Sequence, residues 1–243
     1  MRRMAPAILV LAMLVMVWGA TAGCGQIARK PYDTPAPAPA PAPVKAPPAN
    51  AAVGELVLPT AETGPAVTEK HFVMNWMLLG PFTFKETDFG GGHQQAAIDR
   101  AFMPNEADLD GTQPVPAGAA WKVMRFAGTE EAGQIDLDAA YGGIDHACVY
   151  AVAWLDCPRD VADARLCAGS DDYLKVWING KLVHTYNKER RAGVADQDVV
   201  SGIALRKGTN RVVVKCVDVV LGWNFFIRLT DSQGKPILVR PKP

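Results

Sequence analysis

The sequence has no excess of charge, because its 25 Lys and Arg residues are balanced by 25 Asp and Glu residues. Without a net positive field a chain cannot hold a polyanion by counterion release, so we expect no nucleic acid partner. The sequence also lacks a nucleophile elbow, a phosphate-binding glycine loop, an HExxH motif and paired CxxC motifs. Its four histidines are scattered, and none has a second metal ligand at helical or finger spacing. These absences predict a protein that is not an enzyme.

The first 23 residues have the pattern of an export signal and not of a folded segment. Two arginines precede an apolar run at 5–18, which is too short to span a bilayer comfortably as a helix of about 20 residues. Thr-Ala-Gly then leads into Cys24, and this arrangement resembles the lipobox of bacterial lipoproteins, in which the cysteine is acylated. The resemblance implies a signal peptide at 1–23 and a lipid bilayer as the partner of Cys24. A signal anchor or a plain secretory signal with an incidental cysteine is the alternative.

Residues 24–67 predict where the rest of the chain lies relative to the lipid. Gly25, and not Asp, follows the cysteine, which by the same resemblance implies the outer membrane of the cell envelope. Proline then alternates with alanine, and this alternation favours extended polyproline II over helix or sheet. We therefore expect a disordered linker that carries a domain clear of the membrane. A proline-rich ligand for a recognition domain is the alternative.

Residues 68–243 are one domain's worth of sequence and have a strand pattern with almost no helical periodicity. Short β-branched and aromatic runs predict strands at 72–80, 119–126, 148–157, 173–180, 181–186, 199–205, 210–220 and 223–231. Asn179-Gly180 is the strongest hairpin signal, since both positions of a type I′ turn require φ > 0, and Gly208-Thr209-Asn210 separates two further strands. The stretch 80–118 is expected to be a long ordered loop. This pattern predicts an all-β fold, a β-sandwich.

Three stretches of this domain, 169–186, 203–216 and 222–237, resemble the galactose-binding-like jelly-roll domains of bacterial secreted and carbohydrate-associated proteins. The runs at 76–82 and 135–143 extend the resemblance over essentially everything after residue 68. It implies a jelly-roll β-sandwich in which an aspartate-rich turn precedes a strand ending in an Asn-Gly hairpin. It implies no single activity, because some members bind sugars and others pack against a neighbouring catalytic domain.

Asp171 and Asp172, next to Ser170, mark the one place where polar groups cluster before a predicted strand. Aspartates in such turns bond nearby backbone amides, which is a purely structural role. The second interpretation is a Ca²⁺ site, since hard oxygen ligands on a tight loop suit that ion. Consecutive aspartates also resemble the calcium-dependent sugar sites of the protective-antigen-type sandwich in yeast adhesins. Asp171 and Asp172 are therefore the candidate metal ligands, and Ca²⁺ is the candidate cofactor.

Trp177 is the candidate platform for a sugar ring. Alternation along its strand places Leu174, Val176 and Ile178 on one face and Trp177 on the more polar face. An exposed indole offers a flat apolar surface that stacks against the C–H face of a pyranose. The alternative is that the long loop at 80–118 covers the indole. The other candidate ligand-binding residues lie near the predicted hairpin: Tyr173, His184 and Tyr186.

Besides Cys24, the chain has four cysteines, Cys148, Cys157, Cys167 and Cys216. An even number in an exported domain is typical of disulfides in an oxidising compartment, and four cysteines allow three pairings. Cys157 and Cys167 flank a short connection, so that pair is the candidate disulfide. Free buried thiols remain the alternative, whereas a zinc site is disfavoured by the irregular spacing.

Together these patterns predict a lipid-anchored β-sandwich of the cell envelope that acts as a non-catalytic binding module, with a glycan as the leading ligand class. The alternative is a structural domain that packs against another envelope protein without binding sugar. A glycosidase is disfavoured, because it requires two carboxylates about 5–10 Å apart across a cleft. Asp171 and Asp172 are instead adjacent in a turn.

Overall fold

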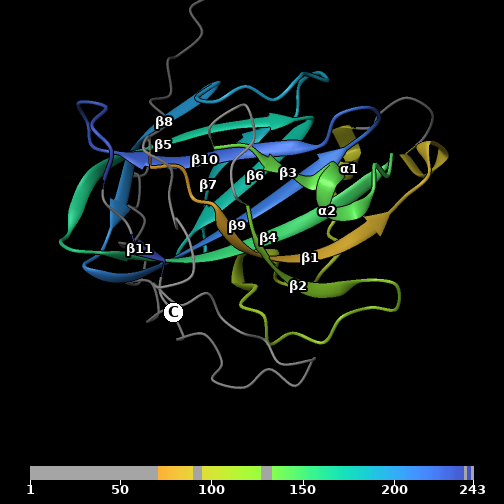
Figure 1. Ribbon diagram of the computed structural model, residues 1–243, viewed down its shortest axis with the longest axis horizontal. Helices are drawn as coiled ribbons and strands as arrows, with labels where there is room; N and C mark the ends of the chain where they lie inside the picture. Colours follow the sequence, from red (N-terminus) through yellow and green to blue (C-terminus); the bar gives the residue numbers. More distant parts are fainter. Residues whose placement is uncertain (1–70, 90–94, 127–132, 238–239, 242–243) are drawn as a thin grey trace, which may run out of the picture. The chain divides into compact units, whose positions relative to one another are not determined.

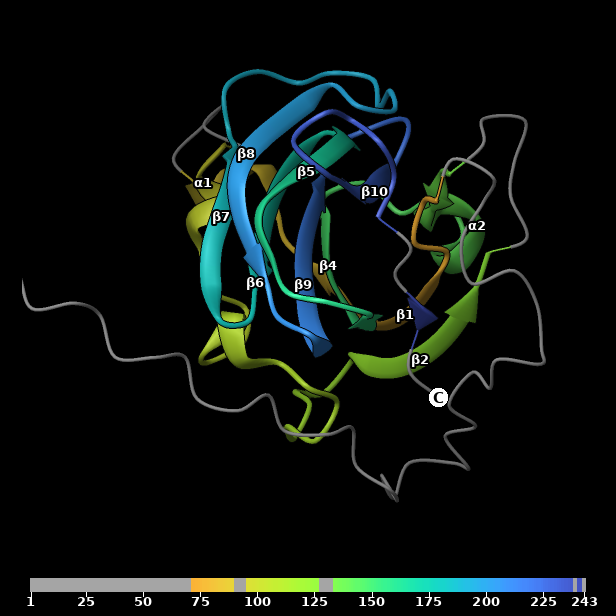
Figure 2. The ribbon, with the colours of Figure 1, turned by 90° about the vertical axis from the view of Figure 1, so that its left-hand side faces the viewer.

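The computed structural model describes residues 71–89, 95–126, 133–237 and 240–241, where two β-sheets pack face to face (Figure 1). Figure 2, turned by 90°, separates the two layers. The predicted all-β sandwich is confirmed. Residues 1–67, with the predicted signal peptide, Cys24 and the linker, lie outside the described residues. Among the residues that are described, no helix has the length and apolar character needed to cross a membrane.

One sheet has seven strands, and its neighbouring strands run antiparallel. Its order is β2 (Ala120–Arg125), β1 (Asn75–Thr83), β4 (Ala147–Cys157), β9 (Gly208–Asp218), β6 (Tyr173–Ile178) and β7 (Lys181–Tyr186), with β11 (Arg240–Pro241) pairing to β4. The other sheet has four strands in the order β3 (Ile135–Asp136), β10 (Asn224–Thr230), β5 (Val161–Asp171) and β8 (Asp198–Leu205). A short helix, α2 (Leu137–Tyr141), follows β3.

The main core lies between the two sheets and follows the alternation of side chains along each strand. Leu174, Val176 and Ile178 of β6 point into it, as their spacing predicts. Trp76 of β1 meets Phe225 of β10 edge to face, with ring centroids 5.2 Å apart. Residues from both sheets therefore share one buried layer, which holds the sheets together through apolar burial.

A second core lies on the outer face of the seven-stranded sheet, under the segment between β1 and β2. This segment contains η1 (Glu86–Phe89), α1 (Gln95–Asp99) and η2 (Glu106–Asp108). The fully buried Lys215 of β9 fastens it: Nζ donates to Ile98 O at 2.9 Å, to Arg100 O at 2.5 Å and to Glu106 Oε1 at 2.8 Å. In the described parts of the expected long loop, two short 3-10 turns and a short helix cover the sheet.

The Asn179-Gly180 hairpin is confirmed, since both residues have positive φ, 52° and 82°, between β6 and β7. The turn between β8 and β9 lies slightly earlier than expected, at 206–207, because Gly208 already belongs to β9. Asn210 closes this turn by accepting from Arg206 N and donating to Arg206 O. Asparagine side chains thus shape both turns.

The structure contains a strand, β5, that the sequence analysis did not predict. Its outward positions include exposed Asp163 and half-buried Arg165, and its buried end contains the small residues Ala168, Gly169 and Ser170, none of which favours strands strongly. Two neighbouring strands, β10 and β8, override this weak local preference through long antiparallel ladders. Consequently Asp171 is the last residue of a strand, and the turn before β6 contains only Asp172.

The predicted disulfide between Cys157 and Cys167 is wrong, because Cys148, Cys157, Cys167 and Cys216 are all free and buried. Cys157 ends β4 in the seven-stranded sheet, whereas Cys167 lies in the middle of β5 in the other sheet. Six residues of extended strand separate Cys167 from the start of β5, which is about 20 Å. Cys157 Sγ instead donates to Arg159 O at 3.1 Å, and Cys167 Sγ lies 3.8 Å from Thr230 Oγ1.

Candidate functional site

The predicted Asp171–Asp172 position lies where β5 passes into β6, and two loops meet it there. One loop, 187–197, connects β7 to β8, and the other, 219–223, connects β9 to β10. Asp171 is paired in register with Asn224, the first residue of β10. This end of the sandwich therefore combines two strand ends with two loops, and we call it the Asp171 end.

Asp172 is completely buried and joins both loops to the sheet. Its Oδ1 accepts from Arg191 N at 3.3 Å, and its Oδ2 accepts from Val219 N at 3.0 Å and from Arg190 Nε at 3.3 Å. Burial raises the pKa of this carboxyl group, while Arg190 and the backbone donors pull it back. Both oxygens of Asp172 are thus engaged in holding the fold together.

Asp171 is only half-buried and is the more accessible member of the pair. Burial raises its pKa to about 7, with the neighbouring Asp172 adding to the effect and the backbone N–H of Gly193 opposing it. A Cβ atom at Gly222 would lie 2.7 Å from Asp171 Oδ2, so the backbone of the 219–223 loop passes directly beside the carboxyl group. Near neutral pH, Asp171 can therefore either donate or accept a hydrogen bond.

Asn224 and Leu221 complete the Asp171 end. Asn224 is buried, and its Oδ1 has no hydrogen-bond partner among the described residues. A Cβ at Gly193 would lie 1.9 Å from that oxygen, so only glycine lets the 187–197 loop pass there. Leu221 has a φ of 80° and a side chain that is 81% exposed, while its N–H donates to Asp145 Oδ1 at 3.2 Å.

A third carboxyl group, that of Asp218 at the end of β9, also lies at this end and is buried, as Asp172 is. Its Oδ1 has no partner within the described part of the chain. Burial raises the pKa of Asp218 to about 8, and the charges of Asp172, Asp145, Asp138 and Asp171 add to the shift. Burial and the charges of the neighbouring aspartates therefore both favour the protonated form of this carboxyl group.

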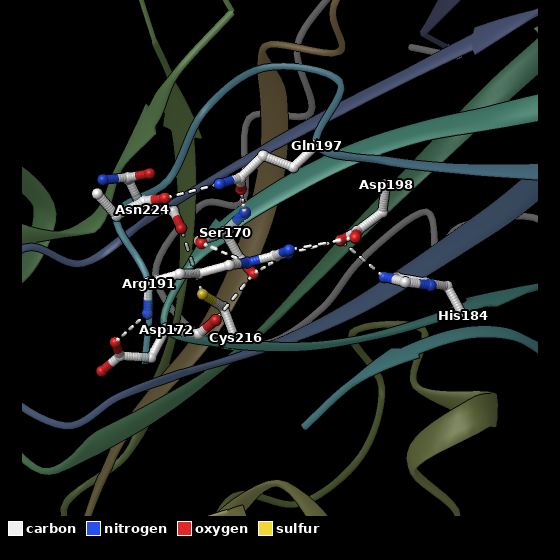
Figure 3. A network of polar contacts seen from close by, with 9 residues as sticks. Ser170, Asp172, His184, Arg191, Gln197, Asp198, Cys216 and Asn224 are labelled. Atoms are coloured by element: carbon white, nitrogen blue, oxygen red, sulfur yellow. Dashed lines mark hydrogen bonds and ion pairs between the residues drawn. The ribbon is translucent and has the colours of Figure 1, made fainter. Parts of the chain in front are cut away.

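Figure 3 shows how the 187–197 loop is fastened on the other side, through Arg191. Its guanidinium forms two bonds with Asp198, one of them Nη1 to Oδ1 at 3.1 Å, and two with Ser170, from Nε to O at 3.2 Å and from Nη2 to Oγ at 3.0 Å. Asp198 also contacts His184 Nε2 at 3.0 Å. Burial alone would raise the pKa of Asp198, but the bonds from His184 and Arg191 lower it overall. Arg191 thus connects β5, β7 and β8.

Ser170, His184 and Asp198 have the composition of a hydrolytic triad but not its arrangement. Ser170 Oγ donates to Asp172 O at 3.1 Å and accepts from Arg191 Nη2 at 3.0 Å, so both of these bonds are to groups other than His184. A serine nucleophile requires a hydrogen bond to its base, with the acid behind the base. Here Arg191 stands between the serine and the aspartate, so the group serves as a structural clamp.

The four aromatic and histidine candidates do not form an exposed platform, and for Trp177 the alternative, a covering segment, is the one found. Trp177 and Tyr173 are only 7% and 3% exposed, because the segment between β1 and β2 covers them. His184 is engaged by Asp198, and the guanidinium of Arg191 covers the ring of Tyr186. The structure brings His184 and Tyr186 together around Arg191 but leaves Trp177 in the outer core.

At Asp172, the predicted calcium ion would compete with hydrogen-bond donors that are already in place. Both oxygens of Asp172 already accept N–H groups, one of them from a guanidinium. Within the described residues, no group of three or more His, Cys, Asp or Glu side chains is placed to hold a metal ion. Calcium requires six to eight oxygen ligands, so the structural interpretation of the pair is the better supported one.

Several residues of this end were missed from the sequence: Arg190, Arg191, Asp218, Leu221 and Asn224. One signal could have suggested an ion pair: two consecutive arginines follow the paired aspartates in the sequence, with the β6–β7 hairpin between them. Nothing local distinguishes Asn224 or Asp218, because their place at this end depends on the pairing of β10 with β5 and of β9 with β4.

No family model and no curated protein matches the chain. Among solved structures it is similar to a PA14 sugar-binding domain from an RTX adhesin, at 12% identity and a TM-score of 0.38, over 70% of this chain and 96% of that chain. It is also similar to the PA14 domain of the antifreeze protein MpAFP, at 12% identity and a TM-score of 0.34, over 70% of each chain. A β-glucuronidase from Ruminococcus gnavus gives 14% identity and a TM-score of 0.33, over 61% of this chain and 22% of the enzyme. At such low scores, none of these likenesses assigns a ligand or a reaction to the chain.

Proposed function

We propose that the chain is a lipid-anchored protein of the cell envelope whose sandwich is a non-catalytic binding module for carbohydrate. The binding surface is the Asp171 end, with Leu221 as a further contact. An acylated Cys24 attaches the protein to the outer membrane, and the linker up to residue 67 holds the surface clear of the lipid. Some of the galactose-binding-like jelly-roll domains that the sequence resembles bind sugars, and others pack against a neighbouring domain, which is the second candidate function.

The observation that carries the proposal is an exposed, strained leucine, Leu221, next in the chain to the glycine that lies against the carboxyl group of Asp171. Leu221 is 81% exposed, and its neighbour Gly222 lies against Asp171 Oδ2. Its φ of 80° lies in the left-handed region, which disfavours a non-glycine residue by about 1–2 kcal/mol. Backbone strain of this kind clusters at ligand sites, and a strained leucine that points into solvent is accounted for if it contacts a ligand.

The chemistry of a pyranose matches these groups. Its C–H face needs a small apolar surface, which Leu221 offers, and its hydroxyl groups need acceptors and donors at the side. Asp171 supplies either, since burial raises its pKa to about 7. Asn224 lies behind Asp171 and is covered by the backbone of Gly193, so it shapes this end of the sandwich from inside. A polar ligand with one apolar face can therefore contact both Leu221 and Asp171.

A glycan array tests the proposal, using the chain without residues 1–23 and with Cys24→Ser. The variants are Leu221→Ser and Asp171→Asn, which remove the apolar contact and the titratable group. The matched control is Leu182→Ser, because Leu182 is also an exposed leucine, at 48%, but lies by the Asn179-Gly180 hairpin at the opposite end of β6. We expect a glycan signal that Leu221→Ser weakens at least about tenfold and Leu182→Ser leaves unchanged.

A silent array would contradict glycan binding and favour the second candidate, a structural domain that packs against another envelope protein. A signal that both leucine variants reduce equally would place the glycan elsewhere on the sandwich. The anchor is tested separately by labelling cells with a fatty-acid analogue. We expect label in the wild type and none in Cys24→Ala. Equal label in both would contradict the proposed acylation of Cys24.

A further inference from the structure

The buried carboxylate of Asp172, which lies among other acidic groups, needs a compensating cation. Asp172 and Asp218 are 0% and 1% exposed, and Asp171 is half-buried beside them. Charged carboxylates that are buried together repel one another strongly, and they are kept in proteins by a positive partner or by a metal ion. The ion pair found at Asp172 is with Arg190, whose Nε lies 3.3 Å from Oδ2.

Arg190 contacts the kinds of oxygen that a hard cation would bind. Its Nε donates to the Asp172 carboxylate, and its Nη2 donates to the backbone carbonyl of Val220 at 2.6 Å. Carboxylate and backbone carbonyl oxygens are also the typical ligands of Ca²⁺. The guanidinium therefore bridges the β5–β6 junction and the 219–223 loop, while the backbone of Arg191 attaches the 187–197 loop to the same carboxylate.

A metal ion at Asp172 would compete with these donors for the carboxylate oxygens. The N–H groups of Arg191 and Val219 point at the two carboxylate oxygens, and their hydrogens would face a cation unfavourably. The Arg190 side chain is 38% exposed, so it can be removed without opening the hydrophobic core. Its role at this position can thus be separated from the packing of the sandwich.

We propose that Arg190 is the resident cation of the Asp171 end, so that a guanidinium and not a metal ion holds the 187–197 and 219–223 loops on the β5–β6 junction. The arrangement of the loops is then independent of Ca²⁺. This inference concerns how the loops are held and does not rest on carbohydrate binding. Its test contains no glycan, so its failure and that of the proposed function are distinguishable.

The experiment uses the chain without residues 1–23 and with Cys24→Ser, stripped of metal by EDTA, with and without 5 mM CaCl₂. The readouts are the melting temperature and the hydrogen–deuterium exchange of peptides from 187–197. We compare the wild type with Arg190→Gln and with Lys188→Gln, an exposed lysine in the same loop that loses the same charge. Arg190→Lys, which keeps the charge but not the two-armed geometry, is the milder variant.

We expect calcium to shift the wild-type melting temperature by less than about 1 °C, since a ligand that does not bind the native state cannot stabilise it. Arg190→Gln should lower the melting temperature by at least about 3 °C and speed exchange in the loop about tenfold. Lys188→Gln should do neither, and Arg190→Lys should fall between. A calcium-dependent rise in the wild type that EDTA reverses would overturn the proposal even if Arg190→Gln does not fold. Equal behaviour of Arg190→Gln and Lys188→Gln would overturn it as well.

Discussion

The guanidinium carbon of Arg191 lies 3.4 Å from the centre of the Tyr186 ring, and the same guanidinium forms its ion pair with Asp198. Tyr186 ends β7 and Asp198 begins β8, so one side chain fills the space where the chain passes from the seven-stranded sheet to the four-stranded sheet. Through Ser170 it also reaches the end of β5. Two consecutive residues thus hold the 187–197 loop: Arg190 bonds Asp172, and Arg191 bonds Asp198 and Ser170.

The first prediction concerns the geometry of Arg191. Arg191→Lys keeps the charge but cannot stack flat on Tyr186 while bonding both Asp198 and Ser170. Because the arginine side chain is only 14% exposed, we expect the free energy of unfolding to fall by about 1–3 kcal/mol, measured by urea denaturation. Arg159→Lys, in an exposed turn, is the control and should change stability by less than about 0.5 kcal/mol. If Arg191→Lys lost no more unfolding free energy than Arg159→Lys, the charge alone, and not the planar guanidinium, would hold the loop.

The second prediction concerns acid. The pKa of Asp198 is lowered in the folded state despite the opposing effect of burial, because His184 and Arg191 bond its charged form. The unfolded chain therefore takes up this proton first, and the stability that Asp198 contributes is present above about pH 4 and is lost as the pH falls below it. Asp198→Asn should be less stable than the wild type at pH 6, with the difference shrinking towards pH 3. Melting curves across this range measure it, and a difference that stays constant with pH would contradict the role of the charge.

Local patterns predicted the parts of the fold that local forces decide. The alternation of Leu174, Val176 and Ile178 placed the inner face of β6 correctly, since a period of two has only two faces to choose from. The Asn179-Gly180 turn was predictable because its backbone requires those residue types. The burial of Trp177 could not be decided from its strand alone, because the segment that covers it is distant in the sequence and is held in place by Lys215.

The candidate site shows the same division. Asp171 and Asp172 could be selected from the sequence as a polar pair, but their roles depend on partners from other strands and loops. Arg190 arrives from the loop after β7, Val219 from the loop after β9 and Asn224 from β10. Long-range pairing of this kind leaves no local signal. For the same reason, short spacing alone suggested a Cys157–Cys167 disulfide, whereas the chain between them crosses from one sheet to the other.

The third prediction concerns alkali and Asp218. Burial raises the pKa of this carboxyl group to about 8 in the folded state, against about 4 in the unfolded chain. Between these values the folded state binds the extra proton, so the stability of the wild type should fall as the pH rises from about 4 to 8. Asp218→Asn is neutral at every pH and of the same shape. We expect it to melt higher than the wild type at pH 8.5 and close to it at pH 5.

The control for Asp218 is Asp163→Asn, which removes the same charge from an exposed position on β5. It should change the melting temperature little and similarly at both pH values. If Asp218→Asn destabilises the protein more at pH 8.5 than at pH 5, the charged form of Asp218 must be stabilising, and the raised pKa would be wrong. A smaller slope that remains in Asp218→Asn is expected from Asp171, whose pKa is also raised, to about 7.

The last prediction concerns the buried pair of Lys215 and Glu106, which holds the covering segment on the outer face of the seven-stranded sheet. The Lys215 side chain is 0% exposed and that of Glu106 is 14% exposed, with Nζ and Oε1 2.8 Å apart. Glu106 also bonds the hydroxyl group of Tyr150, so removal of the lysine leaves a carboxylate with one partner in an apolar setting. Lys215→Met should therefore lower the free energy of unfolding by about 3–5 kcal/mol, and Glu106→Gln by a similar amount. The double variant buries no charge, so we expect it to lose at least about 1 kcal/mol less than the sum of the two.

Lys175→Met is the control, because its partner Asp99 is 61% exposed and such pairs contribute below about 1 kcal/mol. Urea denaturation of the four variants measures these differences, and strictly additive losses would mean that the lysine acts through its bonds to Ile98 and Arg100 alone.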